Sequence, residues 1–159
     1  MTQIPSIKIE IMRQVYFIFW MALIIFLGLG AFIGGGMLIL DPTGDTIKLP
    51  LEILEYTPFN NFLIPGILLF VSFGLTPLLL VYPLLRQSYS IFFDGFNVMT
   101  DMHWAWTFVI YIALALIIWI QVQMEMLREI LWIHSFYTFY AILMIVFALL
   151  PGVRLKYKR

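Results

Sequence analysis

Residues 104–124 read WAWTFVIYIALALIIWIQVQM, a run of 21 residues without Lys, Arg, Asp or Glu. A helix of about 20 apolar residues is long enough to cross the hydrocarbon core of a bilayer, which is roughly 30 Å thick. Three other runs lack these charged residues over a similar length: 15–40 (26 residues), 62–85 (24) and 130–153 (24). We predict that the four runs form transmembrane helices, because none alternates as a membrane strand does.

The composition of the 159-residue chain excludes a water-soluble domain. Apolar residues make up 63% and charged residues 11% of the chain, whereas soluble domains carry roughly 45–50% and about 25%. Nine Lys and Arg balance nine Asp and Glu, so the basic surface that binds nucleic acid is missing. The lack of cysteine removes disulfides and thiol redox chemistry. We predict an all-α integral membrane protein with one four-helix domain over residues 1–159.

Positive charges gather on one side of the predicted helices. Seven of the nine precede the first helix, separate the second from the third, or follow the fourth: Lys8, Arg13, Arg86, Arg154, Lys156, Lys158 and Arg159. Membrane proteins carry an excess of Lys and Arg on their cytoplasmic side. We therefore predict an antiparallel up-down bundle, with an outward loop at 41–61, an inward loop at 86–103 and both termini in the cytoplasm.

Small residues and prolines mark the first two predicted helices. They are candidates for close helix packing: Gly28, Gly30, Gly34, Gly36, Pro65, Gly66, Gly74 and Pro77. Gly30 and Gly34 lie one turn apart, and small residues let backbones approach each other within a membrane. This face predicts an ordinary contact between helices, a dimer seam or a gap of ligand size. Because proline removes a backbone donor, the second helix is expected to be kinked.

Polar side chains cluster at the outward ends of the third and fourth helices. An antiparallel hairpin with its apex near 127–128 brings Gln121 and His134 to a similar depth. Polar groups inside a membrane are costly and find partners, so we expect His134 to bond to Gln121 or Glu125. The cluster either lines an outward-facing pocket or fixes the register of the hairpin. The candidate pocket residues are as follows: Gln121, Glu125, Glu129, His134, Asp41, Asn60 and Asn61.

The inward side offers weaker candidates. One candidate is a loop cluster of Asp94, Asp101 and His103, whose side chains could contribute ligands to a hydrated divalent cation. Loop residues of this kind are more often interfacial polar groups. The predicted topology separates the two histidines, so we expect no metal site and no cofactor. Four C-terminal cations suit anionic lipid headgroups: Arg154, Lys156, Lys158 and Arg159. No set of catalytic residues is evident.

Four short motifs carry a resemblance to a known group of proteins. They are LPL at 49–51, TPF at 57–59, FLIPG at 62–66 and ALLPGVR at 148–154. With them the chain resembles small four-helix bacterial membrane proteins of uncharacterised function, loosely similar to DoxX-like proteins. The resemblance implies a four-helix bundle in the cytoplasmic membrane and supplies no catalytic residue. The DoxX name is sometimes associated with oxidoreductase activity. This sequence has no cysteine and no evident set of cofactor-binding residues to support that activity.

Three functions remain open at this point. The first is a non-enzymatic accessory module that binds lipid or a membrane protein partner, which the small-residue face and the missing catalytic set favour. The second is a small-molecule transporter or carrier, which four spans require to work as an oligomer. The third is an enzyme that acts on a lipid or quinone-like substrate, with His134 and Glu125 or Glu129 as general acid or base.

Overall fold

A computed structural model describes residues 4–128 and 130–159. The secondary structure of these residues is helical. The long elements are α1 (Ile4–Leu40), α5 (Trp104–Leu127), α6 (Trp132–Leu149) and a composite of α2 (Leu63–Leu68), η3 (Leu69–Leu75) and α3 (Thr76–Arg86). Four stretches are long and apolar enough to cross a membrane, as predicted: Ile7–Leu40, Leu63–Arg86, Trp104–Leu127 and Trp132–Leu149.

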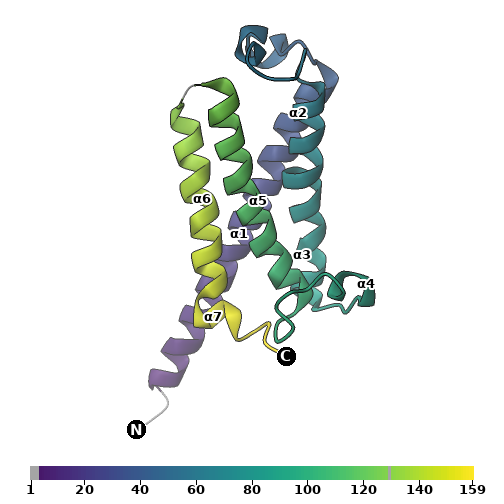
Figure 1. Ribbon diagram of the computed structural model, residues 1–159. Helices are drawn as coiled ribbons and strands as arrows, with labels where there is room; N and C mark the ends of the chain where they lie inside the picture. The colour runs from purple at the N-terminus through teal and green to yellow at the C-terminus, as the bar shows by residue number, and fades with distance from the viewer. Residues whose placement is uncertain (1–3, 129) are drawn as a thin grey trace.

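The long helices lie side by side as an elongated bundle (Figure 1). α1 packs against α2, η3 and α3, and α5 packs against α6. The connection that holds η1 (Asp45–Ile47) and η2 (Leu51–Leu54) lies at the same end as the turn between α5 and α6. α4 (Ile91–Asp94), α7 (Pro151–Arg154) and the C-terminus lie at the other end. We call these the loop end and the tail end.

The fourth helix ends earlier than the sequence predicts. We expected helix over 130–153, but α6 stops at Leu149 and Leu150 is extended, with φ −57° and ψ 138°. Pro151 explains the break, because its ring disfavours the helical conformation in the residue before it. Pro151 then starts α7, where a missing N–H costs nothing.

The second membrane-crossing helix widens in the middle. Residues of η3 form a π-helical segment between two α-helical ones. Pro77 has no N–H to give to the carbonyl four residues earlier, so the regular ladder is interrupted there. The carbonyl of Val71 accepts from both the amide and the hydroxyl of Thr76, the latter at 2.7 Å.

Backbone contact joins α1 to this widened helix. A Cβ on Gly35 would lie 2.6 Å from the amide nitrogen of Phe70 and 2.8 Å from the carbonyl oxygen of Gly66. A Cβ on Gly74 would lie 2.7 Å from the amide nitrogen of Phe32. Glycine is required on both helices, because any side chain there would meet main-chain atoms that have no room to move. Gly28 faces Leu78 in the same seam.

Gly30 and Gly34, the pair that the sequence singled out, lie beside this seam. A Cβ on Gly30 would meet nothing within 4 Å, and one on Gly34 would meet only Leu69 at 3.9 Å. These positions therefore leave space between the helices and do not bring two backbones together.

Indole and phenol groups fasten α6 to its neighbours near the tail end. The Trp20 indole of α1 donates to the carbonyl of Met144 at 3.1 Å, and the Trp106 indole of α5 donates to that of Ala148 at 3.0 Å. The Tyr140 hydroxyl donates to the carbonyl of Leu23. All three donors are buried, so each bond satisfies a polar group that apolar surroundings would otherwise penalise.

The C-terminal residues cross the tail end as a strap. The Tyr157 hydroxyl donates to the carbonyl of Leu84 at 2.8 Å, and the amide of His103 donates to the carbonyl of Tyr157 at 2.8 Å. Arg159 forms two hydrogen bonds with Asp94, at 2.9 and 2.6 Å. This guanidinium holds the pKa of the Asp94 carboxyl at about 2, below its usual range. Lys156 places its ammonium over the ring of Phe17, 3.4 Å from the centroid.

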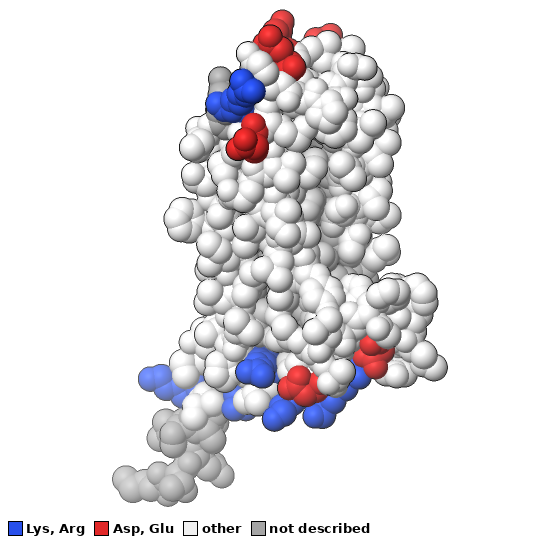
Figure 2. Space-filling view, in the orientation of Figure 1, with Lys and Arg blue, Asp and Glu red and all other residues white. Residues whose placement is uncertain are grey.

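The proposed headgroup cations thus differ in what they contact. All four are exposed, but Lys156 lies over the Phe17 ring and Arg159 is hydrogen-bonded to Asp94. Figure 2 shows most of the visible Lys and Arg at the tail end, with Asp and Glu at both ends.

The glycine seam generates a prediction for stability. Gly35→Ala should lower the unfolding free energy in mild detergent by about 1–3 kcal/mol, because the added methyl overpacks a backbone contact. Gly30→Ala is the matched control, and it should raise the unfolding free energy by about 0.5–1 kcal/mol because alanine favours helix. Thermal unfolding followed by circular dichroism measures both. Equal effects of the two variants would contradict the assignment of the seam.

Candidate ligand cavity

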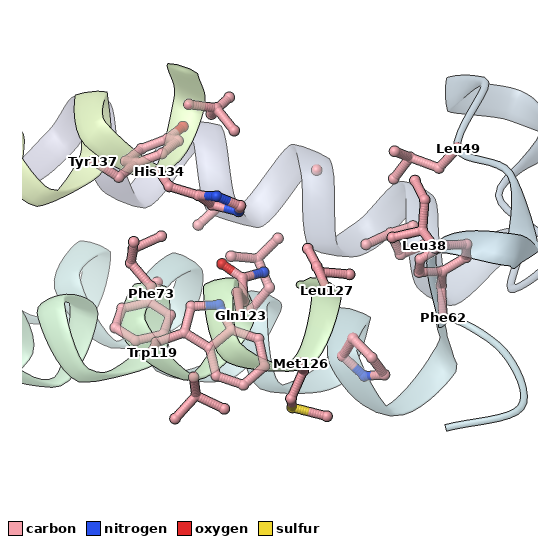
Figure 3. A pocket seen from close by; sticks show the side chains of 18 of the residues that line it. Leu38, Leu49, Phe62, Phe73, Trp119, Gln123, Met126, Leu127, His134 and Tyr137 are labelled. Carbon is pink, nitrogen blue, oxygen red and sulfur yellow. The ribbon is translucent and has the colours of Figure 1, made fainter. Parts of the chain in front are cut away.

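A cavity of about 390 Å³ lies between the helices in the half of the bundle near the loop end. Its wall comes from all four membrane-crossing helices and from the segment that holds η1 and η2. Figure 3 shows Leu38 and Phe62 at one end of the cavity and Phe73 and Trp119 at the other end. Volumes of roughly 300–1,000 Å³ are typical of small-molecule sites.

Missing side chains and diverging helices create this space. Gly30 and Gly34 form part of the α1 wall and contribute no side chain to fill it. Tyr140 still reaches α1, but His134 and Tyr137, which precede it on α6, border the cavity. The helices are therefore closely packed near the tail end, and the cavity lies between them near the loop end.

Most side chains of the described lining are apolar, and those with polar groups include Thr57, Trp119, Gln123, His134 and Tyr137. His134 of α6 and Gln123 of α5 face each other across the cavity (Figure 3). His134 is 3% exposed, and its Nδ1 accepts a hydrogen bond from the amide of Leu131 at 3.2 Å. Its ring therefore caps the start of α6, where the first amides have no helical partner. The described residues provide no hydrogen-bond partner for its Nε2 or for the Gln123 side chain.

The segment between α1 and α2 closes the cavity at the loop end. Leu54 of η2 packs with Leu38 and Phe62 in a small buried cluster. Asp41 orders the start of this segment: its carboxylate accepts from the hydroxyls of Thr43 and Thr46 at 2.6 and 2.7 Å. These bonds, with that of Thr43 the strongest, lower the pKa of Asp41 to about 2, so the carboxylate is charged at neutral pH.

A cation–π contact ties this segment to the turn between α5 and α6. The Arg128 guanidinium lies 4.4 Å from the centroid of the Tyr56 ring. Arg128 directly follows α5 as its C-cap residue and has a positive φ of 52°. The contact therefore connects two segments that are distant in sequence across the loop end.

The residues predicted from sequence do not all meet in the cavity. His134 lines it, whereas Gln121 and Glu125 are exposed and lie outside the described lining. Neither of the two is a hydrogen-bond partner of His134 in the described part of the chain, because they project from another face of α5. Asn60 is exposed, and Asn61 accepts from the amide of Leu63 at 3.0 Å. Glu129 lies outside the described residues.

Gln123 is the cavity residue that sequence reasoning missed. The inward stripe of α5 runs through Ala113, Leu116 and Ile120, and steps of three and four residues continue it to Gln123 and Leu127. Residues so spaced share one helix face. This periodicity distinguishes Gln123 from Gln121, which lies one residue after buried Ile120 and therefore about 100° around the helix.

The cavity is suited to binding an uncharged molecule. Among residues 4–128 and 130–159 its lining includes no Lys, Arg, Asp or Glu. Within the same residues no three His, Cys, Asp or Glu are grouped so as to hold a metal ion. Comparison with protein-family models, curated sequences and solved structures finds no match to this chain. The resemblance to DoxX-like proteins therefore stays a prediction.

Proposed function

We propose that this protein is a non-enzymatic membrane module that binds a lipid-like molecule in the cavity between its four helices. The observation that carries this proposal is an apolar cavity of about 390 Å³ in the half of the bundle near the loop end. Apolar walls with a few placed polar groups are typical of sites for small apolar ligands. Membrane lipids are the nearest source of such a ligand, and a bound lipid also suits an accessory subunit of a larger assembly.

We propose, further, that the four helices cross the cell membrane as an antiparallel bundle with both termini in the cytoplasm. The charge distribution supports this orientation. Seven cations lie at the tail end or in the first part of α1, whereas Lys48 and Arg128 lie at the loop end. The cavity then lies in the outer half of the membrane, where it meets lipids of the outer leaflet.

Filling the cavity tests the proposed function. Gly34→Leu places a side chain in this space, because the first added carbon meets only Leu69, at 3.9 Å. We expect native mass spectrometry in mild detergent to detect retained lipid on the unchanged protein and to lose that signal in the variant. The helix should remain folded, since leucine is a better helix former than glycine.

Ala22→Leu is the matched control for added bulk on α1. Ala22 is exposed and lies outside the cavity lining, so this variant should keep the retained lipid. Loss of lipid from both variants, or from neither, would contradict a binding site in the cavity.

Single cysteines test the orientation, because the native chain has none. Glu52→Cys at the loop end and Thr100→Cys in the inward loop both replace exposed residues. A membrane-impermeant maleimide added to intact cells should label the first variant only, and the second should react after permeabilisation. The reverse pattern would place the termini outside.

A further inference from the structure

We infer that the cavity selects an uncharged amphiphile that carries a carbonyl oxygen, and that His134 and Gln123 donate hydrogen bonds to this oxygen. The inference rests on the proposed function and deepens it. An ester or a quinone-type ketone supplies such an oxygen next to an apolar chain. The walls on either side of the two polar side chains are apolar, so one acceptor within a largely apolar molecule matches the site.

The capping bond of His134 fixes which ring nitrogen carries the proton. Nδ1 accepts from the amide of Leu131 at 3.2 Å, so Nδ1 holds a lone pair there. A neutral imidazole has one N–H, which must then be on Nε2. The protein backbone thus makes Nε2 a hydrogen-bond donor, and the ring that carries it points into the cavity (Figure 3).

This donor faces the cavity, and the described part of the chain provides no hydrogen-bond acceptor for it. His134 as a residue is 3% exposed, so its ring has little contact with solvent outside the cavity. An apolar ligand that fills the cavity would bury Nε2 without an acceptor, which is costly. A ligand with an acceptor removes this cost, whereas a pure hydrocarbon leaves it in place.

Gln123 adds a second donor from the opposite wall. Its carboxamide points into the cavity from α5, and it too has no hydrogen-bond partner among the described residues. A carbonyl oxygen has two lone pairs and can accept from both side chains. The described lining has no cation to balance an anionic headgroup. The described lining therefore does not favour an anionic headgroup, and we assign the selectivity to the facing pair His134 and Gln123.

A comparison of two probes tests this inference. Methyl oleate carries an uncharged ester, and 8-heptadecene is the corresponding hydrocarbon without it. Native mass spectrometry at equal mole fraction in detergent micelles gives the apparent affinity of each probe. The unchanged protein should bind methyl oleate about tenfold more tightly, which is the effect expected of one or two hydrogen bonds.

Three variants locate the recognition. Gln123→Leu and His134→Leu should each reduce the ratio of ester to hydrocarbon affinity, while Gln121→Leu, two residues along α5 and exposed, should leave it unchanged. Hydrocarbon binding serves as the folding control, because a protein that retains it has an intact cavity. His134→Leu also removes a helix cap, so Gln123→Leu, which breaks no bond in the described structure, is the decisive variant.

Two results would overturn the inference. One is an equal affinity of the unchanged protein for both probes, and the other is an equal loss of the ratio in Gln121→Leu and Gln123→Leu. If Gly34→Leu still blocks both probes, the cavity binds lipid and the carbonyl recognition alone is wrong. If Gly34→Leu leaves the binding of both probes intact, the proposed function itself fails.

Discussion

The contact of two helix backbones at Gly35 and Gly74 is the constraint on which the rest of this structure depends. α1 and the composite second helix touch through main-chain atoms, with Phe70 and Phe32 supplying the facing backbone. This seam holds the two helices together without a hydrophobic effect, which is weak between helices in lipid. Near the tail end, buried Trp20 and Tyr140 donors fasten α6 to α1, and the Trp106 indole fastens α5 to α6. The loop end is therefore left with a cavity, which Gly34 on α1 does nothing to fill.

The sequence predicted the membrane-crossing helices because charge-free runs of this length have few other structures available to them. It named Gly28 and Gly74, which make close contacts, but it singled out the Gly30 and Gly34 pair in place of Gly35. Which glycines touch depends on how the second helix is rotated, and the widened segment η3 alters this rotation. The break at Leu150 was readable from Pro151 but was outweighed by the apolar run. The periodicity of α5 could likewise have identified Gln123 as a cavity residue. The prediction used only the depth of each residue in the hairpin, and this criterion favoured Gln121.

In the candidate site, too, the sequence predicted a residue but not its hydrogen-bond partner. His134 was predicted because an ionisable group in an apolar run is expensive. Its partner was not, because the amide of Leu131 becomes available only where α6 starts. In the structure one nitrogen of the ring serves the fold and the other faces the cavity. The two interpretations that the sequence left open, a structural pin and a pocket residue, are thus not exclusive for this side chain.

An experimental structure determined in a lipid environment tests the central claim, that the helices are closely packed at the tail end and enclose a ligand cavity near the loop end. The account predicts elongated density in the cavity, in contact with His134 and Gln123 and extending toward Phe73. The distance between α1 and α6 should increase from Tyr140 toward the loop end. A bundle in which α6 packs against Gly30 and Gly34 along its whole length, with no space for a ligand, would contradict it.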